Sequence, residues 1–216
     1  MLLLSRPMAP SNVVLLLIGL HGTGKSTFAK AATGQDVKVN PTGGVDAYTK
    51  ECNKYTVDFK QRRFIIIDTP GMADQNTIEE NLDVLQQVAD QLQNLDQERV
   101  NGVIYFHSIE GARLSGVDRD NIRILKKICG DEFFPRVAFV TTRWDRIRRS
   151  EWDPILVPRN RDLETERMKL LPNGPSIFRF LNDGESHKAV LDYFAGLEDG
   201  TAANRGDKKA RRSGTG

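Results

Sequence analysis

Eight consecutive residues near the amino terminus have the composition of a phosphate-binding loop. Residues 19–26 read Gly-Leu-His-Gly-Thr-Gly-Lys-Ser and fit the pattern G-x-x-x-x-G-K-[ST] directly after an apolar run. The glycines let the backbone curl so that its N–H groups point at phosphate oxygens, and a helix starting at the lysine adds its positive dipole end. The lysine would neutralise phosphate charge, and the serine hydroxyl would bind Mg²⁺. We therefore expect nucleotide contacts from Gly22, Thr23, Gly24, Lys25, Ser26 and Thr27.

A second motif, Asp68-Thr69-Pro70-Gly71, ends another apolar run. An Asp at the tip of a buried strand can hold a Mg²⁺-bound water beside a phosphate loop. Gly71 offers a backbone N–H that a γ-phosphate can approach without an intervening side chain, which would couple the following loop to the nucleotide state. Taken alone, the motif also fits a strand-to-turn junction with Asp68 as a cap. Next to the phosphate loop, it predicts that Asp68 binds metal together with Ser26.

A third motif, Thr142-Arg143-Trp144-Asp145, follows the apolar run Val137–Thr141 and is similar to the guanine signature [NT]-K-x-D with Arg in place of Lys. The Asp145 carboxylate can accept hydrogen bonds from both the N1–H and the 2-amino group of guanine, a donor pair that adenine lacks. Arg143 could lay its stem or guanidinium over the purine. We therefore predict base contacts from Thr142, Arg143 and Asp145, and expect Trp144 to pack.

These motifs need strands and helices to position them, and the apolar pattern supplies both. Short runs rich in Val, Ile and Phe read as buried strands over 13–19, 64–68, 103–107, 137–141 and 176–180, with an edge strand over 55–59. Helical periodicity spans 78–92, 122–128 and 190–197. Alternating strands and helices predict a three-layer α/β fold with a mostly parallel sheet and its ligand at the carboxyl ends of the strands, and the phosphate-loop motif makes it a P-loop fold.

Composition limits the function classes. We expect one G domain over 11–198 and a disordered basic, Gly-containing tail over 199–216. A net charge of +2 makes nucleic acid an unexpected partner. Two cysteines fit a reducing, cytoplasmic location, and the longest apolar run, Val13 to Ile18, is too short to span a membrane.

The motifs together resemble the translation-factor-related P-loop GTPases and, within them, the immunity-associated (AIG-type) group related to septins and chloroplast-import GTPases. Thr49-Lys50-Glu51-Cys52 resembles the Thr-Lys-x-Cys of that group's first switch, and Thr142-Arg143 resembles its variant guanine motif. The segment from Gly102 to Asp145 is similar to fungal G-domain-containing proteins. The resemblance covers about Val13 to Leu197 and implies GTP/GDP and Mg²⁺ as ligands.

This sequence departs from the family pattern in the fifth guanine-contact motif and in the phosphate loop. Phe180-Leu181-Asn182 only loosely resembles the Phe-Asn-Asn of the family, which leaves Asn182 as a candidate base contact. His21 stands where related loops have Thr or a small residue. A partner contact, a steric effect on hydrolysis and a surface histidine all fit His21.

The sequence offers no obvious side chain to orient the attacking water. Met72 occupies the position of the water-orienting glutamine of Ras-like proteins and cannot take that role. Thr49 is the predicted switch threonine for Mg²⁺, with Thr42 of the same loop as the alternative. The resemblance implies that a GTP-dependent homodimer supplies the missing group.

The sequence predicts a GTP-binding protein that slowly hydrolyses GTP to GDP as a switch or assembly module. A scaffold with negligible turnover is one alternative. A P-loop ATPase or kinase is another, and it would require the Asp145 motif to be coincidental. The effector of the protein is not predicted.

Overall fold

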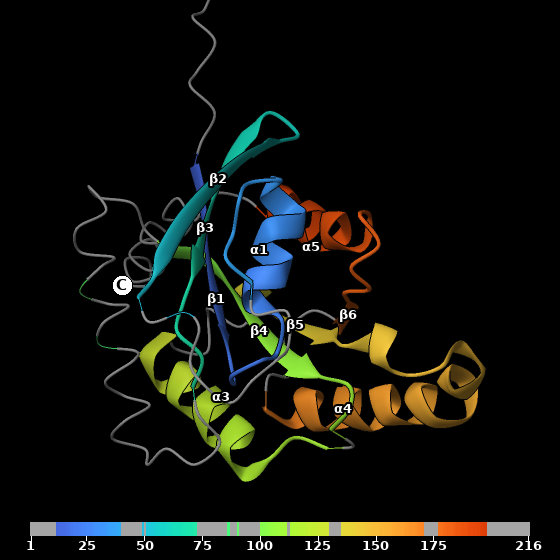
Figure 1. Ribbon diagram of the computed structural model, residues 1–216. Coiled ribbons are helices and arrows are strands. Elements are labelled where there is room, and N and C mark those ends of the chain that lie inside the picture. Colours follow the sequence, from blue (N-terminus) through green and yellow to red (C-terminus); the bar gives the residue numbers. More distant parts are fainter. Residues whose placement is uncertain are drawn as a thin grey trace, which may run out of the picture.

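Six strands form one sheet in the order β2-β3-β1-β4-β5-β6 (Figure 1). The computed structural model describes residues 12–39, 49, 51–72, 86, 90, 100–111, 113–129, 135–170 and 177–197. The strands are β1 (Asn12–Gly19), β2 (Asn53–Phe59), β3 (Arg62–Asp68), β4 (Val100–Ser108), β5 (Val137–Thr142) and β6 (Phe178–Arg179). Only β2 runs antiparallel to its neighbour, so the sheet is mostly parallel, as predicted.

Helices connect the strands. The α-helices are α1 (Lys25–Thr33), α3 (Gly116–Cys129), α4 (Val157–Leu170) and α5 (Ser186–Gly196). Between β5 and α4 lie the 3-10 turns η2 (Trp144–Arg146) and η3 (Arg149–Glu151) and the π-helical turn η4 (Trp152–Leu156). None of the described helices is long and apolar enough to cross a lipid bilayer.

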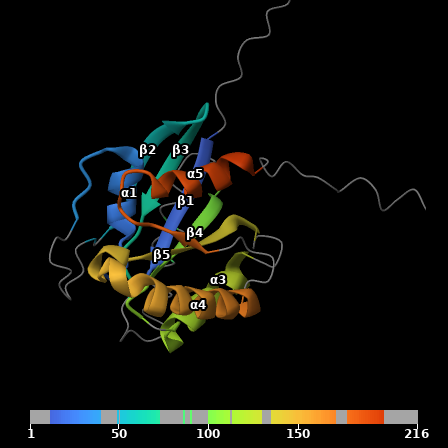
Figure 2. The ribbon, with the colours of Figure 1, turned by 90° about the vertical axis from the view of Figure 1, so that its right-hand side faces the viewer.

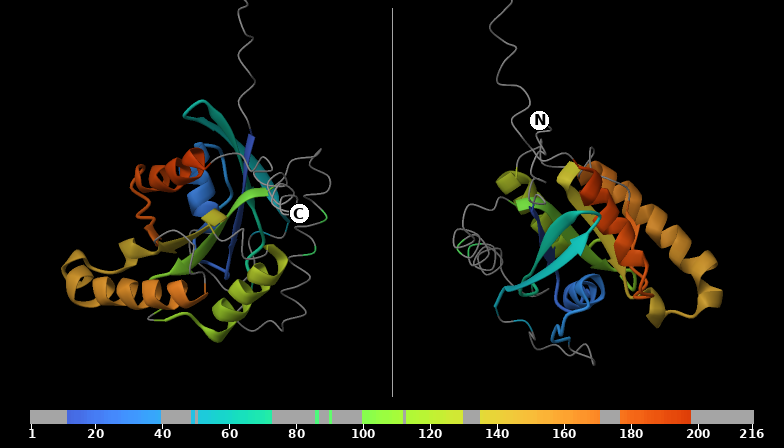
Figure 3. Two further views of the ribbon diagram at one scale, coloured as in Figure 1. Left: turned by 180° about the vertical axis from the view of Figure 1, so that it is seen from behind. Right: turned by 90° about the horizontal axis from the view of Figure 1, so that it is seen from above.

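The central strand β1 is apolar from Val13 to Ile18 because both of its faces are covered. Side chains of a strand alternate between faces, and those of Val13, Leu15 and Leu17 join α1 and α5 in one core, whereas those of Val14 and Leu16 join α3 and α4 in the other. The views in Figures 2 and 3 show these helix pairs on opposite sides of the sheet. The predicted three-layer arrangement is therefore confirmed.

Most predicted elements lie where the apolar pattern placed them. The edge strand is β2, and the strand predicted over 176–180 forms only at Phe178 and Arg179, which pair with Val140 and Thr141 of β5. The helix predicted over 78–92 lies outside the described residues except for Gln86 and Asp90, which are helical. The predicted tail over 199–216 also lies outside them.

The strand register gathers the carboxyl ends of four strands at one edge of the sheet. Leu17 of β1 is level with Asp68, Gly19 is level with Phe106 of β4, and Ser108 is level with Thr142. Parallel strands that end together leave their following loops side by side. The three predicted motifs begin at these ends.

Helix α5 packs so closely on β4 that the sheet has no room for a side chain beneath it. A Cβ atom added to Gly102 would lie 2.1 Å from the Phe194 ring. We predict that Gly102→Ala destabilises the domain by about 1–3 kcal/mol, because the ring or the helix must move. Gly116→Ala is the control, since a Cβ there meets nothing within 4 Å. Urea unfolding measures both, and equal stabilities would contradict this packing.

Candidate functional site

The predicted phosphate loop joins β1 to α1 by a turn that leaves the start of the helix open. Gly24 has φ 92°, a left-handed conformation that suits glycine, and no side chain caps the helix. The N–H groups of the first turn of an uncapped helix favour an anion. The loop therefore has the backbone geometry of an anion site.

Lys25 folds back into its own loop. The ammonium Nζ donates to the carbonyl oxygens of Gly19 at 3.0 Å and Leu20 at 3.1 Å, and the residue is buried. Burial lowers the pKa of Lys25 to about 8, an effect that the nearby Asp68 carboxylate partly offsets. The charged form is thus destabilised here, so a bound phosphate would be a favourable partner for it.

Three oxygen-bearing side chains from distant parts of the sequence meet beside this lysine. The Ser26 hydroxyl donates to Asp68 Oδ2 at 2.6 Å and lies 3.3 Å from the Thr49 hydroxyl. Asp68 is 1% exposed, and its Oδ1 has no hydrogen-bond partner among the described residues. Burial raises the pKa of Asp68, opposed by the Ser26 hydrogen bond and the charge of Lys25. An unpartnered carboxylate oxygen beside two hydroxyls fits the oxygen ligands that Mg²⁺ prefers.

The predicted metal ligands Ser26, Asp68 and Thr49 are therefore brought together. The alternative threonine, Thr42, lies outside the described residues. Within those residues no three His, Cys, Asp or Glu side chains form a metal cluster, so a cation here would also need ligands from a bound molecule.

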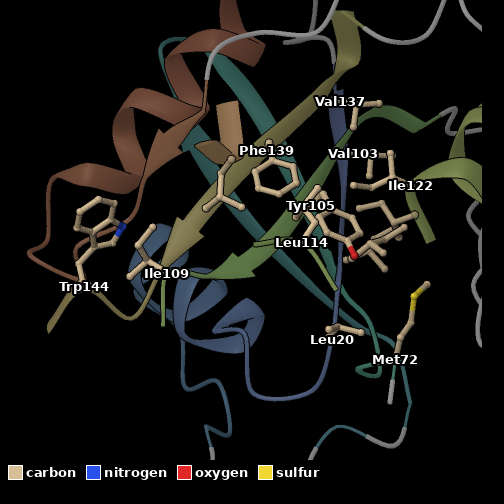
Figure 4. Close-up of a cluster of buried hydrophobic side chains, with 14 of the residues drawn as sticks. Leu20, Met72, Val103, Tyr105, Ile109, Leu114, Ile122, Val137, Phe139 and Trp144 are labelled. Carbon is tan, nitrogen blue, oxygen red and sulfur yellow. The ribbon is translucent and has the colours of Figure 1, made fainter. Parts of the chain in front are cut away.

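The loop after β3 is joined directly to the phosphate loop. The His21 N–H donates to the Met72 carbonyl at 2.8 Å, and the Met72 N–H donates to the Gly19 carbonyl at 3.2 Å. A Cβ atom on Gly71 would lie 2.5 Å from Nδ1 of His21, so the histidine packs against a position that only glycine can fill. Met72 is buried in the core with Leu20 and Tyr105 (Figure 4).

The third motif is also tied to the phosphate loop. The Thr142 hydroxyl donates to the Thr23 carbonyl at 2.7 Å, and the Arg143 guanidinium donates from Nε to the Gly22 carbonyl at 2.9 Å and from Nη2 to the same oxygen. These hydrogen bonds hold two consecutive carbonyls of the phosphate loop against the segment at the end of β5. The two loops form one unit although more than a hundred residues separate them.

A pocket of about 300 Å³ lies between these loops and the loop after β6. Its lining is Gly24, Thr27, Val39, Thr142, Arg143, Asp145, Arg146, Phe180 and Asn182. A second pocket of about 410 Å³ adjoins the metal-ligand set and is lined by Asp36, Lys38, Thr49, Glu51, Asn53, Tyr55 and Asp68.

Two of the predicted residues make contacts within the protein that the motifs did not indicate. Thr23 donates its hydroxyl to the Leu20 carbonyl at 2.8 Å and does not line the pocket, because the tight turn directs it inward. Arg143 lies against Gly22, a contact that the predicted position over a purine did not include. Trp144 is fully buried, as expected.

Sequence reasoning missed Val39, Arg146 and Phe180 in the pocket lining. Arg146 follows the third motif by one residue and could have been found by extending it. Phe180 stands two residues before Asn182, which the loose family resemblance had identified. Val39 carries no signal in the sequence, because only the fold of the chain after α1 brings it to the pocket.

Similar solved structures share this arrangement of elements. Toc33 from Arabidopsis thaliana in complex with Mg²⁺ and GMPPNP superposes with a TM-score of 0.67 at 16% identity, covering 86% of this chain and 85% of that chain. A structure described as showing that dimerisation is important for the GTPase activity of atToc33 and psToc159 gives 0.62 at 15% identity, covering 87% and 85%. Era in complex with MgGDPNP and 16S ribosomal RNA gives 0.59 at 16% identity, covering 92% and 61%. At such identities the likeness establishes the fold.

Sequence relatives cover a shorter stretch. The nucleolar GTP-binding proteins 1 of Candida glabrata and Saccharomyces cerevisiae are each 39% identical over 72 residues, which is 33% of this chain. The matched stretch is 11% of the length of those relatives.

The link between Thr142 and Thr23 leads to a prediction. Thr142→Val keeps the shape of the side chain but leaves the Thr23 carbonyl without its donor, and we expect GDP affinity to fall by about fivefold, or about 1 kcal/mol. Thr165→Val is the control, since the Thr165 hydroxyl also donates to a carbonyl, but on α4. Calorimetric titration with GDP measures both, and equal affinities would show that the link does not support the loop.

Family membership follows from a match over more than half of the chain. Residues 14–131 match the family of proteins described as 50S ribosome-binding GTPase. That range contains the phosphate loop, Asp68 and Gly71, and the third motif follows it at the end of β5. With its P-loop, its carboxylate-bearing β3 and its parallel sheet, this chain belongs to the 50S ribosome-binding GTPase family.

Proposed function

We propose that this chain binds GTP and GDP with Mg²⁺ and slowly hydrolyses GTP to GDP, as a molecular switch or assembly module. One observation carries the proposal: the oxygen cluster of Ser26, Thr49 and Asp68 and the pocket that contains Asp145 lie at the same edge of the sheet, joined by the phosphate loop. A polyphosphate with a purine at one end would connect the two.

The phosphate groups of the nucleotide would contact the amides of the phosphate loop and Lys25. When phosphate enters, the Lys25 ammonium exchanges the Gly19 and Leu20 carbonyls for phosphate oxygens, which suit its charge better. Ser26, Thr49 and Asp68 would hold Mg²⁺, which neutralises phosphate charge when bound. Gly71, next to His21, would offer its N–H to the γ-phosphate.

The guanine base of the nucleotide would bind to Asp145. Its carboxylate is exposed into the pocket and has two acceptor oxygens for the N1–H and 2-amino group of guanine. Thr142 and Arg143 hold this loop against the phosphate loop, and Asn182 adds an amide on the facing wall. An adenine nucleotide would leave the carboxylate without donors.

Slow turnover is inferred from Met72. Its side chain is buried in the core, so it neither orients water nor reaches the γ-phosphate from there. A partner molecule would supply the missing group, and we propose a GTP-dependent homodimer. The reported importance of dimerisation for Toc33 and Toc159 components supports this. The same features fit an assembly module with negligible turnover.

Finer assignments rest on the sequence. We propose an affinity with the immunity-associated, septin-related group, supported by Thr49-Lys50-Glu51-Cys52 and Thr142-Arg143. A G domain over 11–198 followed by a basic tail, and a cytoplasmic location, are supported by composition and by the free thiol of Cys52. The effector of such a switch is not proposed.

The base assignment is tested with Asp145→Asn. An amide donates to the 2-carbonyl of xanthine but meets the 2-amino group of guanine unfavourably, so we expect preference to change from GDP to XDP. Competition against fluorescent GDP measures it, with ATP as a further competitor. Asp162→Asn on α4 is the control, because Asp162 is exposed and outside the pocket. An unchanged preference, or displacement by ATP as effective as by GTP, would remove Asp145 from base selection.

Turnover is tested against protein concentration. With Met72 buried, we expect the monomer to hydrolyse GTP at or below about 10⁻⁴ s⁻¹, and the rate per molecule to rise with concentration if a dimer forms. Phosphate release from GTP is measured at each protein concentration, and light scattering with GDP and with a non-hydrolysable GTP analogue reports the oligomeric state. Fast hydrolysis by a strict monomer would contradict both the slow turnover of the monomer and the acceleration by a dimer. His21→Ala would then show whether His21 supplies the catalytic group.

A further inference from the structure

Both tryptophans of the chain lie together behind the base pocket, each stacked with an arginine. The rings of Trp144 and Trp152 meet edge to face, with centroids 5.4 Å apart. The Arg179 guanidinium lies over the Trp144 ring, 4.7 Å from its centroid, and Arg149 lies over Trp152 at 4.8 Å. Trp144 stands at the end of β5 (Figure 4) and is fully buried, so Arg179 covers an indole that has no contact with water.

Trp144 joins the two walls of the pocket. Its indole Nε1 donates to the Thr141 carbonyl at 3.2 Å, and the same oxygen accepts the Phe180 backbone N–H at 2.8 Å. Thr141 also donates its hydroxyl to the Phe178 carbonyl at 3.2 Å. The pocket wall that carries Asp145 is thus connected through Thr141 to the wall that begins at Phe180.

Each wall contains a backbone conformation that needs support. Arg143 has φ 64° and Asn182 has φ 54°, both in the left-handed region that side chains other than glycine rarely adopt. Such residues persist when their surroundings hold them in place. Trp144 directly follows Arg143, and Arg179 stands three residues before Asn182, so their stacked side chains fasten both segments.

We propose that Arg179 is a positioning residue for guanine specificity, acting through the Trp144 ring to hold the neighbouring Asp145 where its carboxylate can accept from both the N1–H and the 2-amino group of guanine. Arg179 does not line the pocket and is itself exposed. It contributes through the attraction between its cation and the indole face. The proposal rests on the proposed guanine-nucleotide binding.

The test compares GDP with inosine diphosphate, which lacks only the 2-amino group. Displacing Asp145 weakens its hydrogen bond to N1–H, which both nucleotides share, and its hydrogen bond to the 2-amino group, which only GDP makes, so GDP should lose more affinity than inosine diphosphate. We expect Arg179→Gln to reduce the preference for GDP over inosine diphosphate by about 3- to 10-fold. A change confined to folding stability would instead lower both affinities by the same factor.

Two further variants define the interaction. Arg179→Lys keeps a cation for the indole face and should retain most of the preference. Arg161→Gln removes an exposed arginine of α4 that does not line the base pocket, and it should leave the preference unchanged. Thermal unfolding of each variant accompanies the titrations.

An unchanged ratio in Arg179→Gln, or an equal loss for both nucleotides, would overturn the proposal. So would a loss in Arg179→Lys as large as that in Arg179→Gln, because the cation would then be irrelevant. If the unaltered protein binds neither nucleotide, the proposed function itself fails. Tight GDP binding with an unaltered ratio in Arg179→Gln refutes only the role of Arg179.

Discussion

The carboxylate of Asp68 ends a strand that is buried on both faces, and the arrangement of the phosphate loop depends on it. An ionised carboxylate in an apolar environment costs several kcal/mol unless it is paired or hydrogen-bonded. Here the Ser26 hydroxyl donates to one oxygen and Lys25 supplies a nearby charge, while burial acts against the charged forms of both Lys25 and Asp68. A polyphosphate with its cation would satisfy the charges of both Lys25 and Asp68.

Hydrogen bonds that end on backbone carbonyls connect the loops around that site. Thr142 and Arg143 donate to the carbonyls of Thr23 and Gly22, and Met72 exchanges hydrogen bonds with residues of the phosphate loop. Because the phosphate loop lies between these partners, a ligand that shifts it must also shift the base loop or the segment after β3. This geometry provides a route by which nucleotide state would reach the surface.

The position of Met72 beside the phosphate loop also separates nucleotide binding from catalysis. Burying Met72 fixes the start of the segment after β3 in the core and leaves His21 against Gly71, where a γ-phosphate would approach. Under the proposed function, this arrangement would bind nucleotide with groups of its own chain and leave the orientation of the attacking water to another residue or another molecule.

The sequence by itself determined the α/β fold, the order of the strands along the chain and the three motifs, because apolar periodicity and glycine-rich turns are local signals. It also singled out Ser26, Asp68 and Asp145, which the structure places at one edge of the sheet. Only the tertiary structure placed Thr49 beside Ser26, turned Thr23 inward and brought Val39 and Phe180 to the pocket. Such contacts depend on strand register and on how each loop returns to the sheet, and these are set by packing between residues far apart in the chain, for which single-sequence patterns carry no signal.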